Sequence, residues 1–141
     1  MEIQQLYALF LQQEQKVSTD TRKLEKGSIF FALKGDNFNA NAFAISSVES
    51  GCSYAVVDDK NIQHPQCIAV NDVLQTLQDL AKYHRRQFNI PVIGITGTNG
   101  KTTTKELVNQ VLSTKYKVHC TKGNFNNHIG VPLTLLSMFK G

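Results

Sequence analysis

The spacing of hydrophobic residues over positions 1–88 alternates between the helical period and the strand period. Apolar residues near the amino terminus recur every three or four positions, as on one face of a helix. Residues 28–33 form a short apolar run that is typical of a buried strand. The predicted helices are 3–11, 42–50 and 71–88, and the predicted strands are 28–33, 54–57 and 66–70. This alternation predicts an α/β unit of about 85 residues.

The longest predicted helix in this unit begins at Asn71, whose side chain is suited to an N-cap. A histidine on the apolar side of a helix is a satisfied core residue far more often than a ligand, and we predict that role for His84. The pair Asp58–Asp59 follows a strand and is interpreted as a solvated turn rather than a metal site. The predicted inward face of the helix consists of Val73, Leu77, Leu80, Ala81, His84 and Phe88.

A second pattern begins after a linker at 89–91. Residues 91–96 are rich in β-branched side chains and predict a buried parallel strand. A glycine loop follows, and then come a helix at 101–114, a strand at 117–121 and a helix at 131–138. The predicted inward side chains of the first of these helices are Leu107, Val108, Val111 and Leu112. Two strands and two helices cannot cover both faces of a nucleotide-binding parallel sheet, so we expect the chain to be part of a longer protein.

Composition and charge narrow the possible functions. The net charge of +4 is spread along the chain, without the dense basic stripe and interleaved aromatic residues of a nucleic-acid-binding protein. The three cysteines lie far apart, which argues against a disulfide framework or a zinc site and favours buried free thiols in a reducing cytoplasm. No apolar run approaches the roughly 18 residues of a membrane span, and the start lacks a secretory signal pattern. We therefore expect a cytoplasmic protein.

The glycine loop has the composition of a triphosphate-binding loop. Glycines let backbone N–H groups turn toward an anion, and the following helix points the positive end of its dipole at the same place. Lys101 supplies a mobile positive charge for the β- and γ-phosphates of ATP and is the predicted catalytic residue. Thr102 supplies a hydroxyl for Mg²⁺ and is the predicted metal ligand. The predicted ATP-binding residues are Gly97, Thr98, Asn99, Gly100, Lys101, Thr102 and Thr103.

This loop departs from the usual GxxxxGK[ST] pattern by one residue. Ile95 occupies the first glycine position, and Gly94 lies one residue too early. A chance glycine turn is nevertheless a poor alternative, because the strand pattern, the Gly-x-x-Gly-Lys-Thr segment and the amphipathic helix occur together.

Separate motifs along the chain resemble the Mur ligases, which form amide bonds in peptidoglycan precursor synthesis. The loop at 94–104 is similar to the ATP loop of that family, and residues 121–136 are similar to its members that add D-alanyl-D-alanine. Residues 18–22 and 27–35 resemble the UDP-binding N-terminal domain of the last two ligases of the pathway. The sequence lacks the dinucleotide-type glycine fingerprint of the two earlier ligases. It also lacks the Thr-Thr-Pro segment of the ligase that adds lysine or diaminopimelate, and the Gly-Lys-Gly-Ser loop usual in folate polyglutamylating relatives.

The resemblance implies an ATP- and Mg²⁺-dependent ligase whose substrates are UDP-N-acetylmuramoyl-tripeptide and D-alanyl-D-alanine. In such ligases the γ-phosphoryl group passes to the tripeptide carboxylate, and the amine of the dipeptide attacks the acyl phosphate. It also implies that residues 1–88 form a UDP-muropeptide-binding domain and that residues 89–141 begin the central ATP-binding domain. The remaining catalytic and metal residues would lie beyond Gly141, so this chain alone is expected to be inactive. The implied substrate-binding residues are Thr21, Arg22, Gly35, Asp36, Asn37, Asn126 and Asn127.

Structural alternatives remain for some of these residues. In the first alternative, the segment around Thr21 only forms a turn capped by a side chain, with Arg22 in solvent. In the second, Asn126 and Asn127 only stabilise a turn through their side chains. Thr21 replaces the serine that is common in the family and keeps its hydroxyl. Asn39 and Asn41 stand where aspartate and histidine are frequent, so the sequence assigns no ligand role to these two positions.

Two other functions compete with the ligase. A kinase or simple NTPase with a similar loop would not need residues 1–88, and the order of the motifs disfavours it. A non-catalytic UDP-sugar-binding module would carry a vestigial loop. Every residue needed for phosphate contact is present, which disfavours the module.

Overall fold

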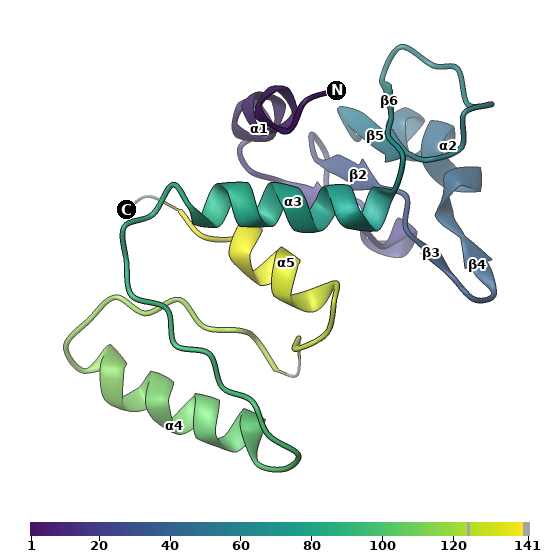
Figure 1. Cartoon of the computed structure of the whole chain (residues 1–141). Helices are drawn as coiled ribbons and strands as arrows, with labels where there is room; N and C mark the ends of the chain where they lie inside the picture. Colours follow the sequence, from purple (N-terminus) through teal and green to yellow (C-terminus); the bar gives the residue numbers. More distant parts are fainter. Residues whose placement is uncertain (124, 140–141) are drawn as a thin grey trace.

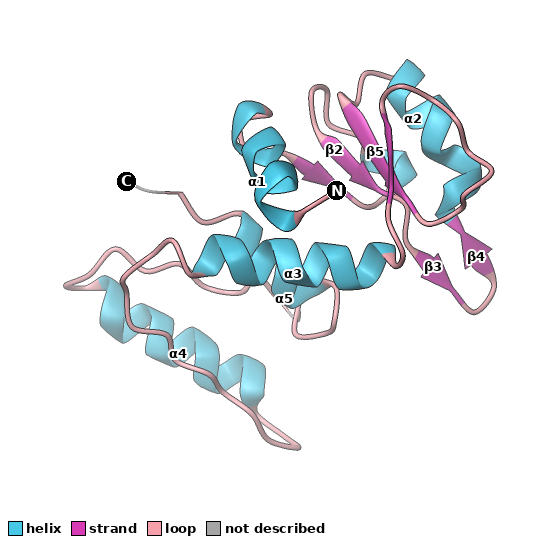
Figure 2. Cartoon of the chain, turned by 45° about the horizontal axis from the view of Figure 1, so that its top comes forward, coloured by secondary structure: helices cyan, strands magenta, loops and turns pink. Residues whose placement is uncertain are grey.

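The computed structural model describes residues 1–123 and 125–139, and it confirms the α/β class with a parallel sheet (Figures 1 and 2). The helices are α1 (Ile3–Gln12), η1 (Thr21–Lys23), η2 (Ala40–Phe43), α2 (Ala44–Glu49), α3 (Val73–Arg85), α4 (Lys101–Ser113) and α5 (Gly130–Leu136), where η marks a 3₁₀ helix. The strands are β1 (Val17–Ser18), β2 (Ile29–Phe31), β3 (Lys34–Gly35), β4 (Phe38–Asn39), β5 (Tyr54–Val57) and β6 (Cys67–Ala69). Each element predicted before residue 89 is present: α1 ends one residue later than predicted, β5 has the predicted bounds, and the others are shorter.

The parallel sheet has the strand order β1-β2-β5-β6. Successive side chains of a strand point to opposite faces, and β2 is buried on both of them. Ile29 and Phe31 pack in the core that includes α1 and α3. Phe30 and Ala32 pack in a second core that includes α2. Burial on both faces explains why the sequence at this strand is a continuous apolar run rather than an alternating one.

The cap of α3 lies one residue later than the sequence prediction. The side chain of Asp72 accepts a hydrogen bond of 2.7 Å from the backbone N–H of Gln75, so the prediction of Asn71 as the N-cap was wrong. Both side chains are capable of capping, and the spacing of apolar residues does not decide between neighbours. The predicted inward face is buried except Phe88, which lies beyond the helix end and is half-buried.

His84 is a satisfied core residue, as predicted. Its side chain is 1% exposed. Its Nδ1 atom lies 3.1 Å from the hydroxyl of Tyr7 on α1, and its Nε2 atom lies 2.8 Å from the backbone oxygen of Met138. His84 thereby joins α1, α3 and the segment that follows α5.

Residues 91–96 and 117–121 are not strands in the structure, contrary to the prediction. Neither segment pairs with another strand within residues 1–123 and 125–139. The side chains of Val92 and Ile93 are 62% and 61% exposed. A strand exists through the backbone hydrogen bonds that it shares with a neighbour, so a β-branched run without a ladder partner stays irregular.

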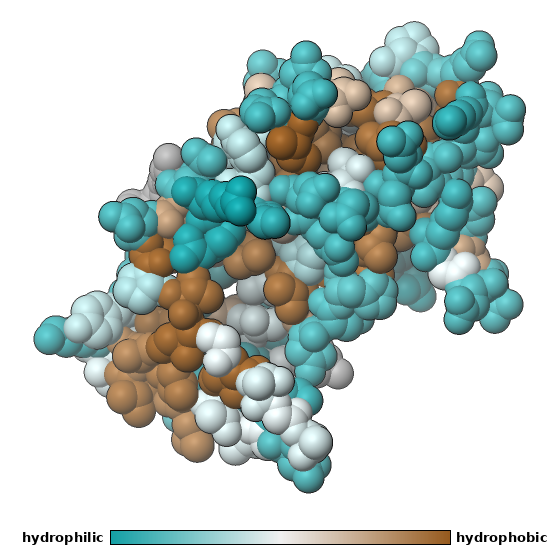
Figure 3. Space-filling model, viewed as in Figure 1, coloured by the Kyte–Doolittle hydropathy of each residue, from teal (hydrophilic) through white to brown (hydrophobic). Residues whose placement is uncertain are grey.

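The predicted inward face of α4 is only partly covered, because Val108 and Leu112 are half-buried and the other two residues are exposed. Leu107 is 59% exposed and Val111 is 68% exposed. Figure 3 shows hydrophobic side chains gathered on the surface over α4. The helical period was therefore predicted correctly, but the core that would cover this face is not formed by the described residues.

The short helix α5 packs on α3, which the sequence did not predict. Leu136 is 2% exposed and belongs to the core formed by α1, α3 and β2. The side chain of Gln78 on α3 donates a hydrogen bond of 3.1 Å to the backbone oxygen of His128, just before α5. These contacts connect the segment after the glycine loop to the parallel-sheet unit.

Two further findings concern the cysteines and the length of the helices. All three cysteines are free, as expected, but only Cys52 is buried, whereas Cys67 and Cys120 are half-buried. Across the part of the chain that the structure describes, every helix is too short or too polar to cross a membrane.

Candidate functional site

The glycine loop lies at the amino end of α4 and presents its backbone to solvent (Figure 1). Gly97 and Gly100 have φ angles of 153° and 75°, in the region that only glycine adopts readily. Gly100 is the N-cap of α4, and its backbone oxygen accepts a hydrogen bond of 2.9 Å from Thr104. Within the described residues, the N–H groups of 97–103 donate no hydrogen bond. The loop therefore offers exposed donors, together with the positive end of a helix dipole, to an anion.

The side chains of Lys101, Thr102 and Thr103 lie in the first turn of α4. The ammonium group of Lys101 folds back and donates a hydrogen bond to the backbone oxygen of Gly97. Thr102 and Thr103 are exposed, and their hydroxyls make no hydrogen bond with any described residue. The structure thus brings the predicted ATP-binding residues together in one turn, with Lys101 held over the loop.

The described residues supply no cage of several side-chain ligands for a magnesium ion at Thr102. Among residues 1–123 and 125–139 there is no cluster of three or more histidine, cysteine, aspartate or glutamate side chains that would hold a metal ion. Mg²⁺ usually keeps several waters and binds through one or two protein ligands together with substrate phosphates. The exposed hydroxyl of Thr102 fits that pattern as a single ligand.

The predicted substrate turn lies on a small hairpin beside the parallel sheet (Figure 1). Strands β3 and β4 are antiparallel, with Gly35 opposite Phe38. Asp36 and Asn37 form the exposed turn between them. The hairpin therefore presents Gly35, Asp36 and Asn37 to solvent, where a bound nucleotide would have access to the backbone and to both side chains.

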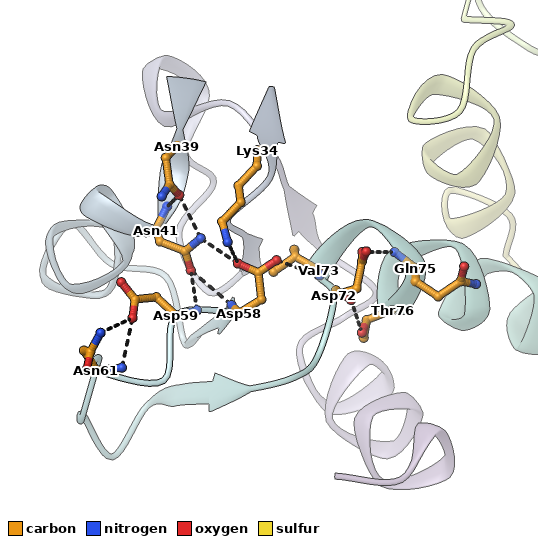
Figure 4. Close-up of polar contacts among 10 residues, drawn as sticks. All are labelled: Lys34, Asn39, Asn41, Asp58, Asp59, Asn61, Asp72, Val73, Gln75 and Thr76. Carbon is orange, nitrogen blue, oxygen red and sulfur yellow. Dashed lines mark hydrogen bonds and ion pairs between the residues drawn. The ribbon is translucent and has the colours of Figure 1, made fainter. Parts of the chain in front are cut away.

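A buried asparagine, to which sequence patterns assign no ligand role, anchors this hairpin (Figure 4). Asn41 is 3% exposed. Its Nδ2 atom donates 2.8 Å hydrogen bonds to the side chains of Asn39 and Asp58. Its Oδ1 atom accepts from the backbone N–H groups of Asp58 and Asp59 at 3.1 and 3.3 Å. All four hydrogen-bonding positions of the amide are therefore used.

Asp58 connects the hairpin to the start of α3, so its interpretation as part of a solvated turn was wrong. Its side chain is 12% exposed and lies 2.6 Å from the ammonium group of Lys34 on β3. Its other oxygen accepts a hydrogen bond of 3.3 Å from the backbone N–H of Val73. Burial raises the pKa of Asp58, but the hydrogen bonds from Lys34, Asn41 and Val73 outweigh it, and the pKa lies below its ordinary value.

We expect this network to make stability fall in acid. Because the folded pKa of Asp58 is below the unfolded value of 3.8, its contribution is present above about pH 4 and is lost as the pH falls through the folded pKa. Asp58→Asn removes the titrating group. Urea unfolding at about pH 5 and about pH 3 should therefore show a smaller loss for Asp58→Asn than for the unmodified chain. The exposed Asp36→Asn is the control, and equal losses in all three proteins would contradict the assignment.

The turn at Thr21 and Arg22 is held by Asp20. The carboxylate of Asp20 accepts from the backbone N–H of Arg22 at 2.9 Å and from its guanidinium at 2.9 and 2.8 Å. The hydrogen bonds from Arg22 lower the pKa of Asp20 to about 2. The side-chain-capped turn is therefore present, but the Arg22 side chain is 85% exposed and its remaining N–H groups stay available to a phosphate.

The two predicted asparagines after the loop differ in their surroundings. The Oδ1 atom of Asn127 accepts from the backbone N–H groups of Ile129 and Gly130 at 3.1 and 2.6 Å, so its side chain holds the turn that begins α5. The side chain of Asn126 is exposed and makes no hydrogen bond with the described residues. A Cβ atom at position 130 would lie 2.8 Å from the backbone of Phe125. The chain can therefore approach the start of α5 this closely only because residue 130 is glycine.

Two groups of candidate residues therefore exist, and they lie apart. The hairpin and the η1 turn belong to the parallel-sheet unit, whereas the glycine loop lies at the far end of the molecule in both ribbon views (Figures 1 and 2). Sequence patterns missed two residues that support these groups. They are Asn41 below the hairpin and Lys105 on α4, and both act through contacts with distant parts of the chain.

Comparison with known proteins finds relatives along most of the chain. The Mur ligase middle domain matches residues 95–141, which include the glycine loop. The UDP-N-acetylmuramoyl-tripeptide–D-alanyl-D-alanine ligase of Bacillus subtilis is 48% identical over 126 residues, and the alignment covers 86% of this chain. The ligase of that name from Escherichia coli is 42% identical over 123 residues, again covering 86% of the chain. The chain spans 27% of the length of each of these two relatives.

Solved structures agree with the sequence comparison. A structure of MurF from Acinetobacter baumannii superposes with a TM-score of 0.81 at 39% identity, covering 88% of this chain and 28% of that protein. MurF ligase from Thermotoga maritima, solved in complex with ADP, superposes with a TM-score of 0.81 at 31% identity, covering 89% of this chain and 30% of that protein. Sequence and fold lead to the same assignment, and the chain belongs to the Mur ligase family.

Proposed function

We propose that this chain is the UDP-muropeptide- and ATP-binding part of a ligase that adds D-alanyl-D-alanine to UDP-N-acetylmuramoyl-tripeptide. The observation that carries the proposal is the exposed glycine loop at the start of α4, with Lys101 folded over it. Two comparisons support the proposal: the chain is 48% identical to a relative named for that reaction, and its fold is similar to that of a MurF ligase solved in complex with ADP. Free cysteines suit a reducing cytoplasm, where we place the enzyme.

The proposed chemistry activates a carboxylate. A carboxylate is a poor electrophile, and transfer of the γ-phosphoryl group of ATP gives it a leaving group. The amine of D-alanyl-D-alanine then displaces phosphate and forms the amide bond. Negative charge builds up on the transferring phosphoryl oxygens, so a positioned cation such as Lys101 has its largest effect in the transition state. Mg²⁺, with Thr102 as one ligand, would neutralise further charge on the phosphates.

The substrates divide between two proposed domains. Residues 1–88 bind the UDP-muropeptide through the η1 turn with Arg22 and through the exposed turn of the β3–β4 hairpin. Arginine suits phosphate geometry, and Gly35 allows a ligand to approach the backbone closely. Residues 89–141 begin the ATP-binding domain, and Asn126 faces the substrate near the γ-phosphate. We assign Asn127 a secondary role there, because its side-chain oxygen already holds the turn before α5.

The proposal predicts that the UDP-muropeptide binds to this chain without ATP. Titration calorimetry of the 141-residue chain with UDP-N-acetylmuramoyl-tripeptide should give a saturable signal, and Arg22→Ala should weaken it. Arg86→Ala, at an exposed arginine after α3, is the control and should bind like the unmodified chain. No detectable binding at about millimolar ligand, by a sample whose folding is verified, would count against the substrate assignment.

A further inference from the structure

The contacts of Lys105 on α4 differ from those of an ordinary surface lysine. Its ammonium group donates 2.7 Å hydrogen bonds to the backbone oxygens of Thr121 and Gly123, and it lies 3.0 Å from the carboxylate of Glu106. Its side chain is only 16% exposed. An ammonium group has three N–H donors, so these three partners satisfy it completely.

The backbone of the contacted segment is shaped for this interaction. Gly123 has a φ angle of 52°, in the left-handed region that favours glycine. The chain turns there, and the backbone oxygens of Thr121 and Gly123 meet at one ammonium group. An exposed ion pair with Glu106 alone would contribute little, so the two backbone contacts are the distinctive feature.

The position of Lys105 on α4 relates this segment to the glycine loop. Lys101 and Lys105 are four residues apart, so they lie on one face of the helix, about 6 Å apart along its axis. Residues 121–123 are therefore fixed one helical turn from the loop. After Phe125, the side chain of Asn127 holds the chain against the start of α5. Side-chain contacts thus hold residues 121–123 before Asn126 and Asn127 after it.

We propose that Lys105 is a positioning residue, which holds residues 121–123 one helical turn from Lys101 and thereby sets the position of Asn126 for phosphoryl transfer. This inference rests on the proposed function. The three N–H donors of Lys105 are used within the chain, so in this proposal it acts through the backbone of residues 121–123, which leads to Asn126. A displacement of about 1 Å between reacting groups is enough to slow a reaction by up to 100-fold. Loss of the Lys105 contacts should therefore reduce turnover more than it weakens substrate binding.

The test compares Lys105→Met, which keeps the chain length and loses the donors, with Lys105→Arg, which keeps charge and donors. In the complete ligase that carries this chain, Lys105→Met should lower kcat by roughly 10-fold or more while both KM values change less than about threefold. Lys105→Arg should regain most of the lost turnover. Lys117→Met, at an exposed lysine beyond α4, is the matched control. Should Lys105→Met not fold, Lys105→Gln takes its place.

Hydrogen exchange gives a second readout that does not depend on catalysis. Amide exchange in residues 121–127 should become faster in Lys105→Met, whereas exchange within α3 should not change. Unchanged exchange in 121–127, an unchanged kcat, or an arginine variant as impaired as the methionine variant would overturn the inference. Failure of the proposed function is recognised separately, because the unmodified ligase would then form no amide product.

Discussion

Replacing Lys101 by alanine should reduce kcat of the complete ligase by about 100-fold or more, the scale seen when one preorganised electrostatic contact is removed. In the structure the loop offers exposed backbone N–H groups, and these remain after any change of side chain. Ground-state nucleotide binding should therefore be weakened much less than turnover. The positive charge of Lys101 stabilises the transition state more than the ground state, because negative charge accumulates on the transferring phosphoryl group. Removal of the Lys101 side chain should therefore lower mainly kcat.

The same variant should leave the UDP-muropeptide site intact. The hairpin and the η1 turn lie away from the glycine loop (Figure 1), and distant, independent sites behave nearly additively. The affinity for UDP-N-acetylmuramoyl-tripeptide should change by less than about 1 kcal/mol, as measured by calorimetry. Lys117→Ala serves as the control for removal of a positive charge. Near-normal turnover by a folded Lys101→Ala enzyme would mean that the loop is not the site of phosphoryl transfer.

Sequence patterns predicted the elements in which the spacing of apolar residues matches the residues that are buried in the structure. Residues 28–33 and 54–57 are continuous apolar runs because β2 and most of β5 are buried. The inward face of α3 was predicted from its 3.6-residue period, and His84 was correctly assigned to the core. The glycine loop was also recognised, because its function depends on consecutive residues and on the helix that follows them.

Other features depend on contacts that no local pattern encodes. Strands β3 and β4 have two residues each, too short for a period to appear. Asn41 and Asp58 are 17 residues apart and meet only through the sheet topology. Lys105 reaches backbone oxygens 16 and 18 residues away.

The second half of the chain shows a different limit of sequence patterns. The β-branched run at 91–96 has the composition of a strand, but a strand also requires a neighbour with which to share hydrogen bonds. All of its residues except the half-buried Ile95 stay exposed in the structure, as do Leu107 and Val111 on α4. The local preference was therefore identified correctly, and the tertiary context decided whether a strand formed.

Product formation by the complete ligase that carries this chain tests the proposed function most directly. The enzyme is incubated with ATP, Mg²⁺, UDP-N-acetylmuramoyl-tripeptide and D-alanyl-D-alanine, and all products are quantified. We expect UDP-N-acetylmuramoyl-pentapeptide, ADP and phosphate in equal amounts, and no pentapeptide when Mg²⁺ or the dipeptide is omitted. An enzyme that hydrolyses ATP equally fast without the muropeptide and the dipeptide, and that forms no amide bond when both are present, would contradict the ligase and favour a simple NTPase.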